Sequence, residues 1–173
     1  PAEEKSAVAR RQTGREIMSA VLNLSNVRKS YGALNALDGL DLALPDNAYV
    51  ALLGPSGSGK TTLLRVIAGF ETPDAGSLTF KGNRIEGVAP HRRDIGFVFQ
   101  NFALFPHLSV AKNIAFGLEH RDIDPVTDPK ILQTRVKDMV ALVGLDGLEE
   151  RSVTQISGGQ RQRVALARTL ITE

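Results

Sequence analysis

The sequence lacks cysteine, long apolar runs and blocks of one charge. Without cysteine the 173-residue chain has no disulfide and no thiolate chemistry, which is compatible with a reducing compartment. Its longest apolar runs, such as YVALL at 49–53, are far shorter than the ~18 residues of a membrane helix. Any membrane role must therefore go through a partner. The net charge is +2, and the sequence contains no long run of lysine or arginine. This small and dispersed excess favours a mixed solvated surface over a nucleic-acid interface.

Histidines and basic clusters are few. His91, His107 and His120 do not have the spacing of metal ligands, so we expect them in loops or on the surface. The HRRD segment at 91–94 fits a solvated turn better than a basic patch.

Residues 1–17 are polar and show no apolar period, and Met18 is a plausible natural start. We expect them to be a disordered tail or an upstream extension, outside the fold. The remaining length and the hydrophobic content of 42% fit a globular protein.

The first half of the chain is rich in strand patterns. Apolar and polar residues alternate from Leu22 to Val27 and again over 37–44, where Pro45-Asp46-Asn47 makes the turn. The apolar run at 49–54 predicts a strand buried on both faces, followed by a helix from Lys60. Two further strands are predicted at 77–82 and 95–100.

From Ser109 the apolar period becomes helical. Ser109 is a predicted N-cap, and the apolar residues Val110, Ile114 and Leu118 follow at intervals of four residues. A second helix is predicted to have Asp128 as its cap and Pro129 at its first position. These helices predict a helical subdomain at 103–150.

The segment GPSGSGKT at 54–61 fits the G-x-x-x-x-G-K-[ST] pattern of a phosphate-binding loop. Glycines let the backbone curl around phosphates, and the N–H groups of the helix start stabilise their charge. We predict that Lys60 reaches the β- and γ-phosphates, that Thr61 ligates Mg²⁺ and that Thr62 lies near the α-phosphate. The motif alone fits a kinase, a GTPase or a motor equally well. The predicted phosphate-binding residues are Gly54, Pro55, Ser56, Gly57, Ser58, Gly59, Lys60, Thr61 and Thr62.

A second glycine-rich helix start follows at ISGGQRQRVALA. Ser157 can cap this helix, but glycine disfavours helix by about 1 kcal/mol per residue, so Gly158 and Gly159 need another reason. A surface that accepts an anion at close range supplies one. One nucleotide can then lie between the phosphate loop of one copy and residues Ser157–Gln160 of another.

Taken together, these segments resemble the ATP-binding subunits of ABC transporters. The order of phosphate loop, IGFVFQ strand and SGGQ is the order of that family, and the resemblance spans about residues 20–173. It implies that Gln100 contacts Mg²⁺ and the attacking water, and that Tyr31 stacks on adenine rather than packing in the core. The stretch FVFQNFALFPHLSVAKNIAFGL is especially similar to bacterial importers of polyamines, ferric iron, sulfate or sugars.

The resemblance also implies segments that follow Glu173 in the family: a strand that ends in Asp-Glu (the Walker B strand) and a later histidine. Because these segments are absent, we expect the 173-residue chain alone to be nearly inactive. Arg161, Arg163 and Arg168 of the last helix either reach phosphate or the partner copy, or are solvated with local ion pairs.

The sequence therefore predicts an α/β fold, with a P-loop NTPase core, an antiparallel N-terminal β-subdomain and a helical subdomain. The predicted divisions are a tail at 1–17, a nucleotide-binding core at 18–102 and the helical subdomain at 103–150. The last division, 151–173, contains the SGGQ motif and the helix that follows it, which we call the signature helix. The catalytic residues are then Lys60 and Gln100.

The predicted function is that of an ATP-binding subunit of an ABC importer, using ATP and Mg²⁺ at the cytoplasmic face of the membrane. Its predicted partners are permease subunits, through about residues 101–118, and a second ATPase subunit; a solute-binding protein acts indirectly, and nucleic acid is not expected. Three alternatives stay open: a soluble ABC ATPase, a non-hydrolysing regulatory subunit and a generic P-loop kinase.

Overall fold

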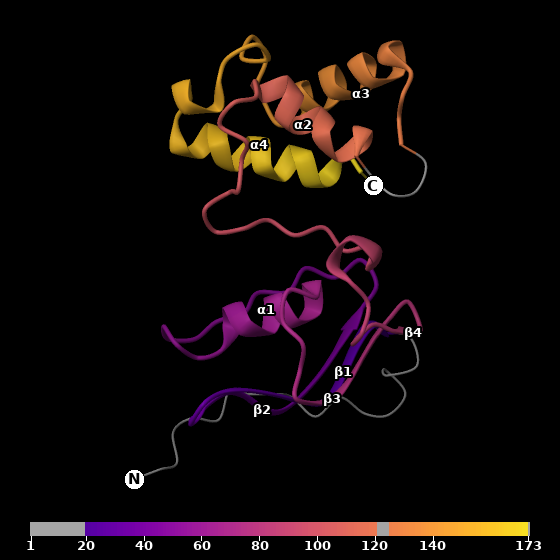
Figure 1. Ribbon diagram of the computed structural model, residues 1–173, viewed down its shortest axis with the longest axis vertical. Helices are drawn as coiled ribbons and strands as arrows, with labels where there is room; N and C mark the ends of the chain where they lie inside the picture. The colour runs from indigo at the N-terminus through magenta and orange to yellow at the C-terminus, as the bar shows by residue number, and fades with distance from the viewer. Residues whose placement is uncertain (1–19, 121–124, 173) are drawn as a thin grey trace. The chain divides into compact units, whose positions relative to one another are not determined.

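The computed structural model describes residues 20–120 and 125–172 and divides the chain into two compact units, at 1–95 and 96–173. Figure 1 shows the elements of both units. The predicted tail at 1–17 lies outside the described residues. No helix in the described part of the chain combines the length and the hydrophobicity that crossing a bilayer requires.

In its described residues, 20–95, the first unit is an antiparallel sheet with one α-helix against it. Its strands have the order β2-β1-β3-β4, and every neighbouring pair is antiparallel. Leu24 of β1 pairs with Leu42 of β2 on one side and with Leu78 of β3 on the other. The elements are β1 (Ala20–Tyr31), β2 (Leu34–Pro45), α1 (Lys60–Ala68), β3 (Ala75–Phe80), β4 (Asn83–Arg84) and the 3-10 helix η2 (Pro90–Arg92).

The predicted antiparallel strands are confirmed, because their alternating residues form one side of the first core. Leu63 and Val66 of α1 pack on that face, which fixes the helix that follows the phosphate loop against the sheet. The buried members of this core are Leu22, Leu24, Val27, Leu37, Leu63, Val66, Leu78 and Ile85.

Two predicted strands are wrong. Residues 48–55 and 94–99 belong to no helix or strand in the structure, and Leu53 is 89% exposed where burial on both faces was expected. A strand requires a neighbour that pairs its N–H and C=O groups, and the four described strands pair only with one another. Apolar composition alone does not supply that neighbour.

The part of the second unit that the structure describes is a group of three α-helices, with the 3-10 helix η3 (Val153–Gln155) before the last of them. The α-helices are α2 (Val110–Glu119), α3 (Pro129–Leu142) and α4 (Gly158–Leu170). Both predicted caps are confirmed: Ser109 accepts from the Lys112 N–H and Asp128 from the Lys130 N–H. The helices share a core that includes Ile114, Leu118, Val140 and Val164.

The α2 and α4 helices approach closely at Gly117. A Cβ atom there would lie 2.9 Å from the Arg168 carbonyl oxygen and 2.9 Å from the Thr172 methyl carbon. Glycine is therefore required for the contact that orients the signature helix against α2.

Candidate functional site

The predicted phosphate loop leads directly into α1. Gly59 is the N-cap, in the left-handed region at φ 85°, and no side chain caps the helix. The first helical hydrogen bond runs from the Leu63 N–H to the Gly59 carbonyl at 2.8 Å. Helix geometry therefore leaves the N–H groups of residues 60–62 without an acceptor inside the helix, which makes this end a receptor for an anion.

Lys60 lies across the loop. Its ammonium nitrogen donates to the carbonyl oxygens of Gly54 at 2.8 Å and Pro55 at 2.6 Å, and to Ser58 Oγ at 3.0 Å. These bonds hold a positive charge within the turn of the loop. The donor set, an ammonium beside uncapped N–H groups, has the chemistry that a phosphate chain needs.

The close approach of β2 is a second reason why position 59 requires glycine. A Cβ atom on Gly59 would lie 2.3 Å from the Ala36 carbonyl oxygen, which belongs to the backbone of that strand. The glycine therefore lets the loop pass against β2, and the positive φ prevents an easy substitution.

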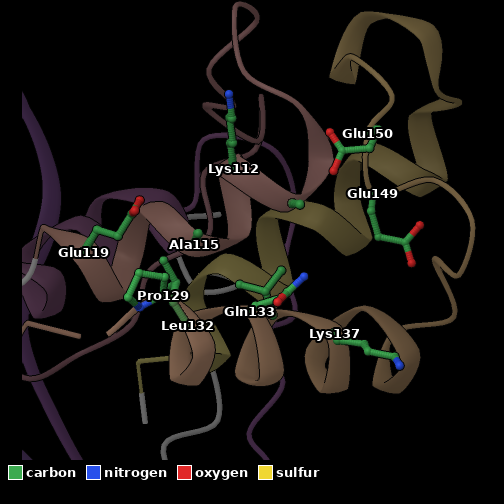
Figure 2. Close-up of a pocket in the computed structure, with 11 residues that line it drawn as sticks. Lys112, Ala115, Glu119, Pro129, Leu132, Gln133, Lys137, Glu149 and Glu150 are labelled. Atoms are coloured by element: carbon green, nitrogen blue, oxygen red, sulfur yellow. The ribbon is translucent and has the colours of Figure 1, made fainter. Parts of the chain in front are cut away.

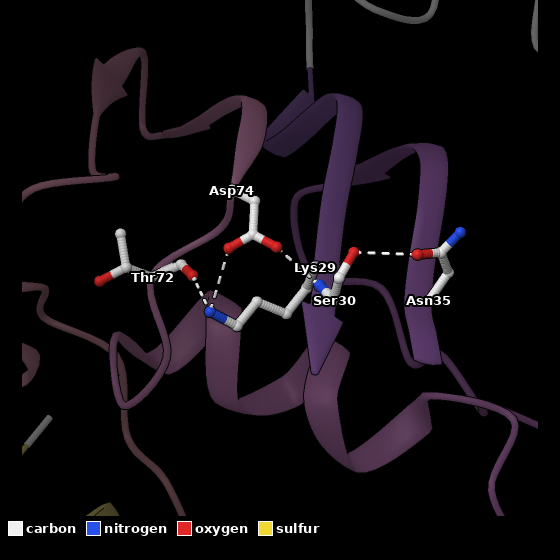
Figure 3. Close-up of polar contacts among 5 residues, drawn as sticks. All are labelled: Lys29, Ser30, Asn35, Thr72 and Asp74. Atoms are coloured by element: carbon white, nitrogen blue, oxygen red, sulfur yellow. Dashed lines mark hydrogen bonds and ion pairs between the residues drawn. The ribbon is translucent and has the colours of Figure 1, made fainter. Parts of the chain in front are cut away.

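Tyr31, the predicted adenine contact, ends β1 and is 45% exposed, so it is not a core aromatic. The Lys29 ammonium lies 5.5 Å from its ring centroid. The same ammonium donates to the Thr72 carbonyl at 2.8 Å and to Asp74 Oδ1 at 3.3 Å (Figure 3). The strand end that carries Tyr31 is thus tied to the 72–74 segment.

Asp74 accepts from the Ser30 N–H at 2.7 Å through its other oxygen, and Ser30 Oγ donates to Asn35 at 3.0 Å (Figure 3). The Ser30 N–H, and after it the Lys29 ammonium, hold the pKa of Asp74 below its usual value of 3.8.

A pH dependence follows from the lowered pKa of Asp74. The stabilisation that this carboxylate contributes is present above the pKa of the unfolded chain, about 3.9, and is lost as the pH falls through the lower folded pKa. We expect Asp74→Asn to lower the denaturation midpoint slightly at pH 7, because the group is exposed. The difference from the wild type should shrink in urea titrations as the pH falls below about 3.9. A difference that is independent of pH, or one equalled by Asp146→Asn, would contradict this assignment.

The second unit carries the other predicted site residues. Gln100 is exposed and directly precedes the 101–108 loop. Ser157 Oγ accepts from the Gln160 N–H at 3.3 Å, while the Gln160 side-chain oxygen accepts from the Ser157 N–H at 2.8 Å. This capping box satisfies two N–H groups and leaves those of the exposed Gly158 and Gly159 without an intrahelical acceptor.

The arginines of α4 bind backbone carbonyls of the second unit. Arg161 donates to the Ile156 carbonyl at 2.8 Å, and Arg163 donates to the carbonyls of Val143 at 3.0 Å and Gly144 at 2.8 Å. Arg168 also donates to backbone carbonyls. These guanidiniums therefore bind the ends of neighbouring segments.

Two buried polar residues were missed or misread from the sequence. Arg93, expected in a solvated turn, is 3% exposed and donates to the Val66 and Ile67 carbonyls at 2.8 and 2.9 Å, at the end of α1. Burial lowers the pKa of this guanidinium. Asn113 is fully buried in α2 and binds the 105–109 backbone. A basic run gave no signal for the role of Arg93, because its acceptors in α1 lie 26 and 27 residues away in the chain. An asparagine in a helix does not by itself indicate that it binds the backbone of the preceding turn.

The three histidines show no metal site. Across residues 20–120 and 125–172, no group of three His, Cys, Asp or Glu side chains could hold a metal ion. His120 instead stacks on Phe116, with ring centroids 4.1 Å apart.

Comparison with known proteins decides the family. The sequence pattern of the ABC transporter family matches residues 37–173, most of the chain. The chain belongs to this family. The predicted resemblance is thereby confirmed.

Two curated relatives of this chain are import ATP-binding proteins. The chain is 49% identical over 153 residues to the spermidine/putrescine import ATP-binding protein PotA of Spiroplasma citri, covering 88% of this chain and 43% of the relative. It is 50% identical over 156 residues to the sulfate/thiosulfate import ATP-binding protein CysA of Synechocystis sp., covering 90% and 42%. The chain thus spans less than half the length of these relatives.

Solved ABC cassettes share the fold. The ATP-binding cassette MJ0796, as a dimer in a post-hydrolysis state bound to ADP and Pi, has a TM-score of 0.80 and 30% identity and covers 87% of this chain and 69% of its own. The cassette MJ1267 has a TM-score of 0.77 at 27% identity, covering 88% and 65%. The predicted α/β fold class with a P-loop NTPase core is confirmed.

Proposed function

We propose that this chain is the nucleotide-binding part of the ATPase subunit of an ABC importer. The single observation that carries the proposal is the uncapped N-terminus of α1, with the Lys60 ammonium held within the loop before it. The names of the relatives add the transport role, since PotA and CysA are import ATP-binding proteins. ATP hydrolysis is proposed for the whole ATPase subunit, of which this chain is the nucleotide-binding part.

In this proposal the loop at 54–62 binds the phosphates of ATP. When a phosphate chain binds, the Lys60 ammonium donates to the phosphate oxygens instead of to the loop carbonyls. The backbone N–H groups of residues 60–62 donate to the same oxygens. The exposed hydroxyl of Thr61 and the Gln100 side chain hold Mg²⁺, which neutralises phosphate charge. Gln100 orients the attacking water, and Tyr31 stacks on adenine.

A second ATPase subunit completes the nucleotide site. The phosphate loop of one copy holds the phosphates, and residues Ser157–Gln160 of the other copy bind them from the opposite side. The N–H groups of the exposed Gly158 and Gly159, at the start of α4, are the donors. Dimers of the related cassette MJ0796 support this pairing.

The permease partner binds the second unit in this proposal. The α2 and α3 helices line a groove of about 400 Å³, in which Ala111, Lys112 and Ala115 come from the predicted contact segment 101–118 (Figure 2). Small side chains beside the charged Lys112 and Glu119 suit a short amphipathic helix. The subunit is then peripheral at the cytoplasmic face, and a solute-binding protein acts only through the permease.

The predicted divisions are retained as part of this proposal. Residues 18–102 form the nucleotide-binding core, 103–150 the helical subdomain and 151–173 the signature segment.

Calorimetric titration with ATP and AMP, with and without Mg²⁺, tests the proposed function. ATP should bind at least about tenfold more tightly than AMP, because only ATP carries the phosphates that Lys60 and the α1 N-terminus receive; a tenfold ratio corresponds to about 1.4 kcal/mol. Mg²⁺ should increase this preference. Equal dissociation constants for ATP and AMP would show that the loop is not a phosphate site.

A further inference from the structure

The loop that follows Gln100 has an unusual backbone. Phe102 and Ala103, two consecutive residues other than glycine, lie in the left-handed region at φ 64° and 45°. L side chains adopt this conformation at an energetic cost, so surrounding contacts must hold it. The Phe102 N–H donates to the Phe99 carbonyl at 2.8 Å, which turns the chain directly at Gln100.

Arg168 supplies contacts that hold this turn. Its guanidinium donates to the Phe102 carbonyl at 3.1 Å and to the Ala103 carbonyl at 2.8 Å, so both left-handed residues bind one planar group. The same guanidinium lies 5.4 Å from the centroid of the Phe105 ring. Burial lowers the pKa of Arg168, but the group stays charged because an arginine pKa is far above neutrality.

The contacts continue from the loop into α2. The Phe105 ring lies 4.4 Å from that of Phe116, which stacks on His120. Arg168 itself belongs to α4, about 11 residues or roughly 16 Å along the helix axis from Ser157. Arg168 therefore connects the helix that begins after Ser157 with the loop after Gln100 and, through Phe105, with Phe116 of α2.

We propose that Arg168 is a positioning residue that couples the nucleotide-receiving end of the signature helix to Gln100, through the Phe102 and Ala103 carbonyls. The inference rests on the proposed function, in which Ser157–Gln160 receive nucleotide from a second copy and Gln100 contacts Mg²⁺ and water.

Arg163 provides a matched control. It lies on the same helix and also donates to two backbone carbonyls, at 3.0 and 2.8 Å, but those carbonyls belong to Val143 and Gly144. Arg163→Ala removes the same number of hydrogen bonds without touching the loop after Gln100. A merely structural role of Arg168 would make the two variants behave alike.

Hydrogen–deuterium exchange of the full chain, with and without ATP and Mg²⁺, tests the coupling. In the wild type and in Arg163→Ala, nucleotide should slow exchange both at 157–161 and at 100–106. In Arg168→Ala the change at 157–161 should persist, while the change at 100–106 should fall at least about tenfold. Arg168→Lys, which keeps the charge but loses the planar two-pronged contact, should show the same loss if the alanine variant does not fold.

The outcomes separate this inference from the proposed function. Retention of the nucleotide effect at 100–106 in the Arg168 variants, or its equal loss in Arg163→Ala, would overturn the coupling. If ATP changes nothing at 157–161 in the wild type, the proposed receipt of nucleotide there fails and the coupling to Gln100 fails with it. The nucleotide-free comparison would then still decide whether Arg168 holds the loop, since exchange at 102–105 should be at least about tenfold faster in Arg168→Ala and unchanged in Arg163→Ala.

Discussion

Lys60→Ala is expected to weaken ATP binding by at least about 100-fold. In the structure the ammonium donates three hydrogen bonds inside the loop, and in the proposed complex it donates to the β- and γ-phosphates. A charge-assisted hydrogen bond contributes about 1.5–3 kcal/mol, so the loss of two corresponds to roughly 100-fold or more in the dissociation constant. Calorimetric titration of the variant with ATP and Mg²⁺ measures the effect.

The loss should be specific to the terminal phosphates. AMP lacks the groups that Lys60 contacts, so its dissociation constant should change less than about threefold and the preference for ATP should disappear. The thermal midpoint of unfolding should stay close to the wild type, because the freed carbonyls of Gly54 and Pro55 are exposed to water. Lys112→Ala, an exposed lysine of the second unit, serves as the control for lost charge. An ATP affinity of Lys60→Ala within threefold of the wild type would contradict the assignment.

Asn113→Ala is expected to lower the free energy of unfolding by about 2–4 kcal/mol. Asn113 is 0% exposed, and its side chain satisfies backbone groups on both sides of a turn. Oδ1 accepts from the Phe105 N–H at 2.8 Å, and Nδ2 lies 3.1, 3.3 and 3.0 Å from the carbonyl oxygens of Phe105, Leu108 and Ser109. Alanine leaves the Phe105 N–H and the Leu108 carbonyl without this partner, while the Phe105 and Ser109 carbonyls keep the backbone N–H groups of Leu108 and Asn113. Each buried unpaired group costs about 1–3 kcal/mol before relaxation.

Asn83→Ala is the matched control for Asn113→Ala. Asn83 is exposed and donates a single hydrogen bond, at 3.3 Å, to the Lys81 carbonyl, so its replacement should cost less than about 0.5 kcal/mol. Urea denaturation followed by circular dichroism measures both variants. Equal midpoints for Asn113→Ala and the wild type would mean that the 105–109 turn does not depend on this side chain.

Much of the local structure follows from the sequence, because the signals act over a few residues. The alternation in 20–45 determines two strands that share one buried face, and the caps Ser109, Asp128 and Ser157 begin their helices by accepting N–H groups two or three residues further on. The phosphate loop is equally local, since glycines, lysine and helix start lie within nine residues of one another. Its functional role and those of Tyr31, Gln100 and Ser157–Gln160 stay predictions.

The pairing of the segment before the phosphate loop is not a local property. YVALL is as apolar as a buried strand, yet Tyr49 and Leu53 are exposed because the described sheet pairs other segments. Periodicity reports which faces of a segment are apolar, and pairing depends on which backbone lies 4.7–4.9 Å away.

The sequence by itself therefore determined the family, the antiparallel strands, the helix starts and the candidate phosphate loop. The partners of two long arginine side chains depend on the tertiary structure, which brings Arg93 to the end of α1 and Arg168 to the loop after Gln100. The Arg168 side chain and the Ala103 carbonyl are 65 residues apart in the chain. A flexible guanidinium reaches many acceptors, and the packing of α2 against α4 selects the carbonyls that lie within its reach.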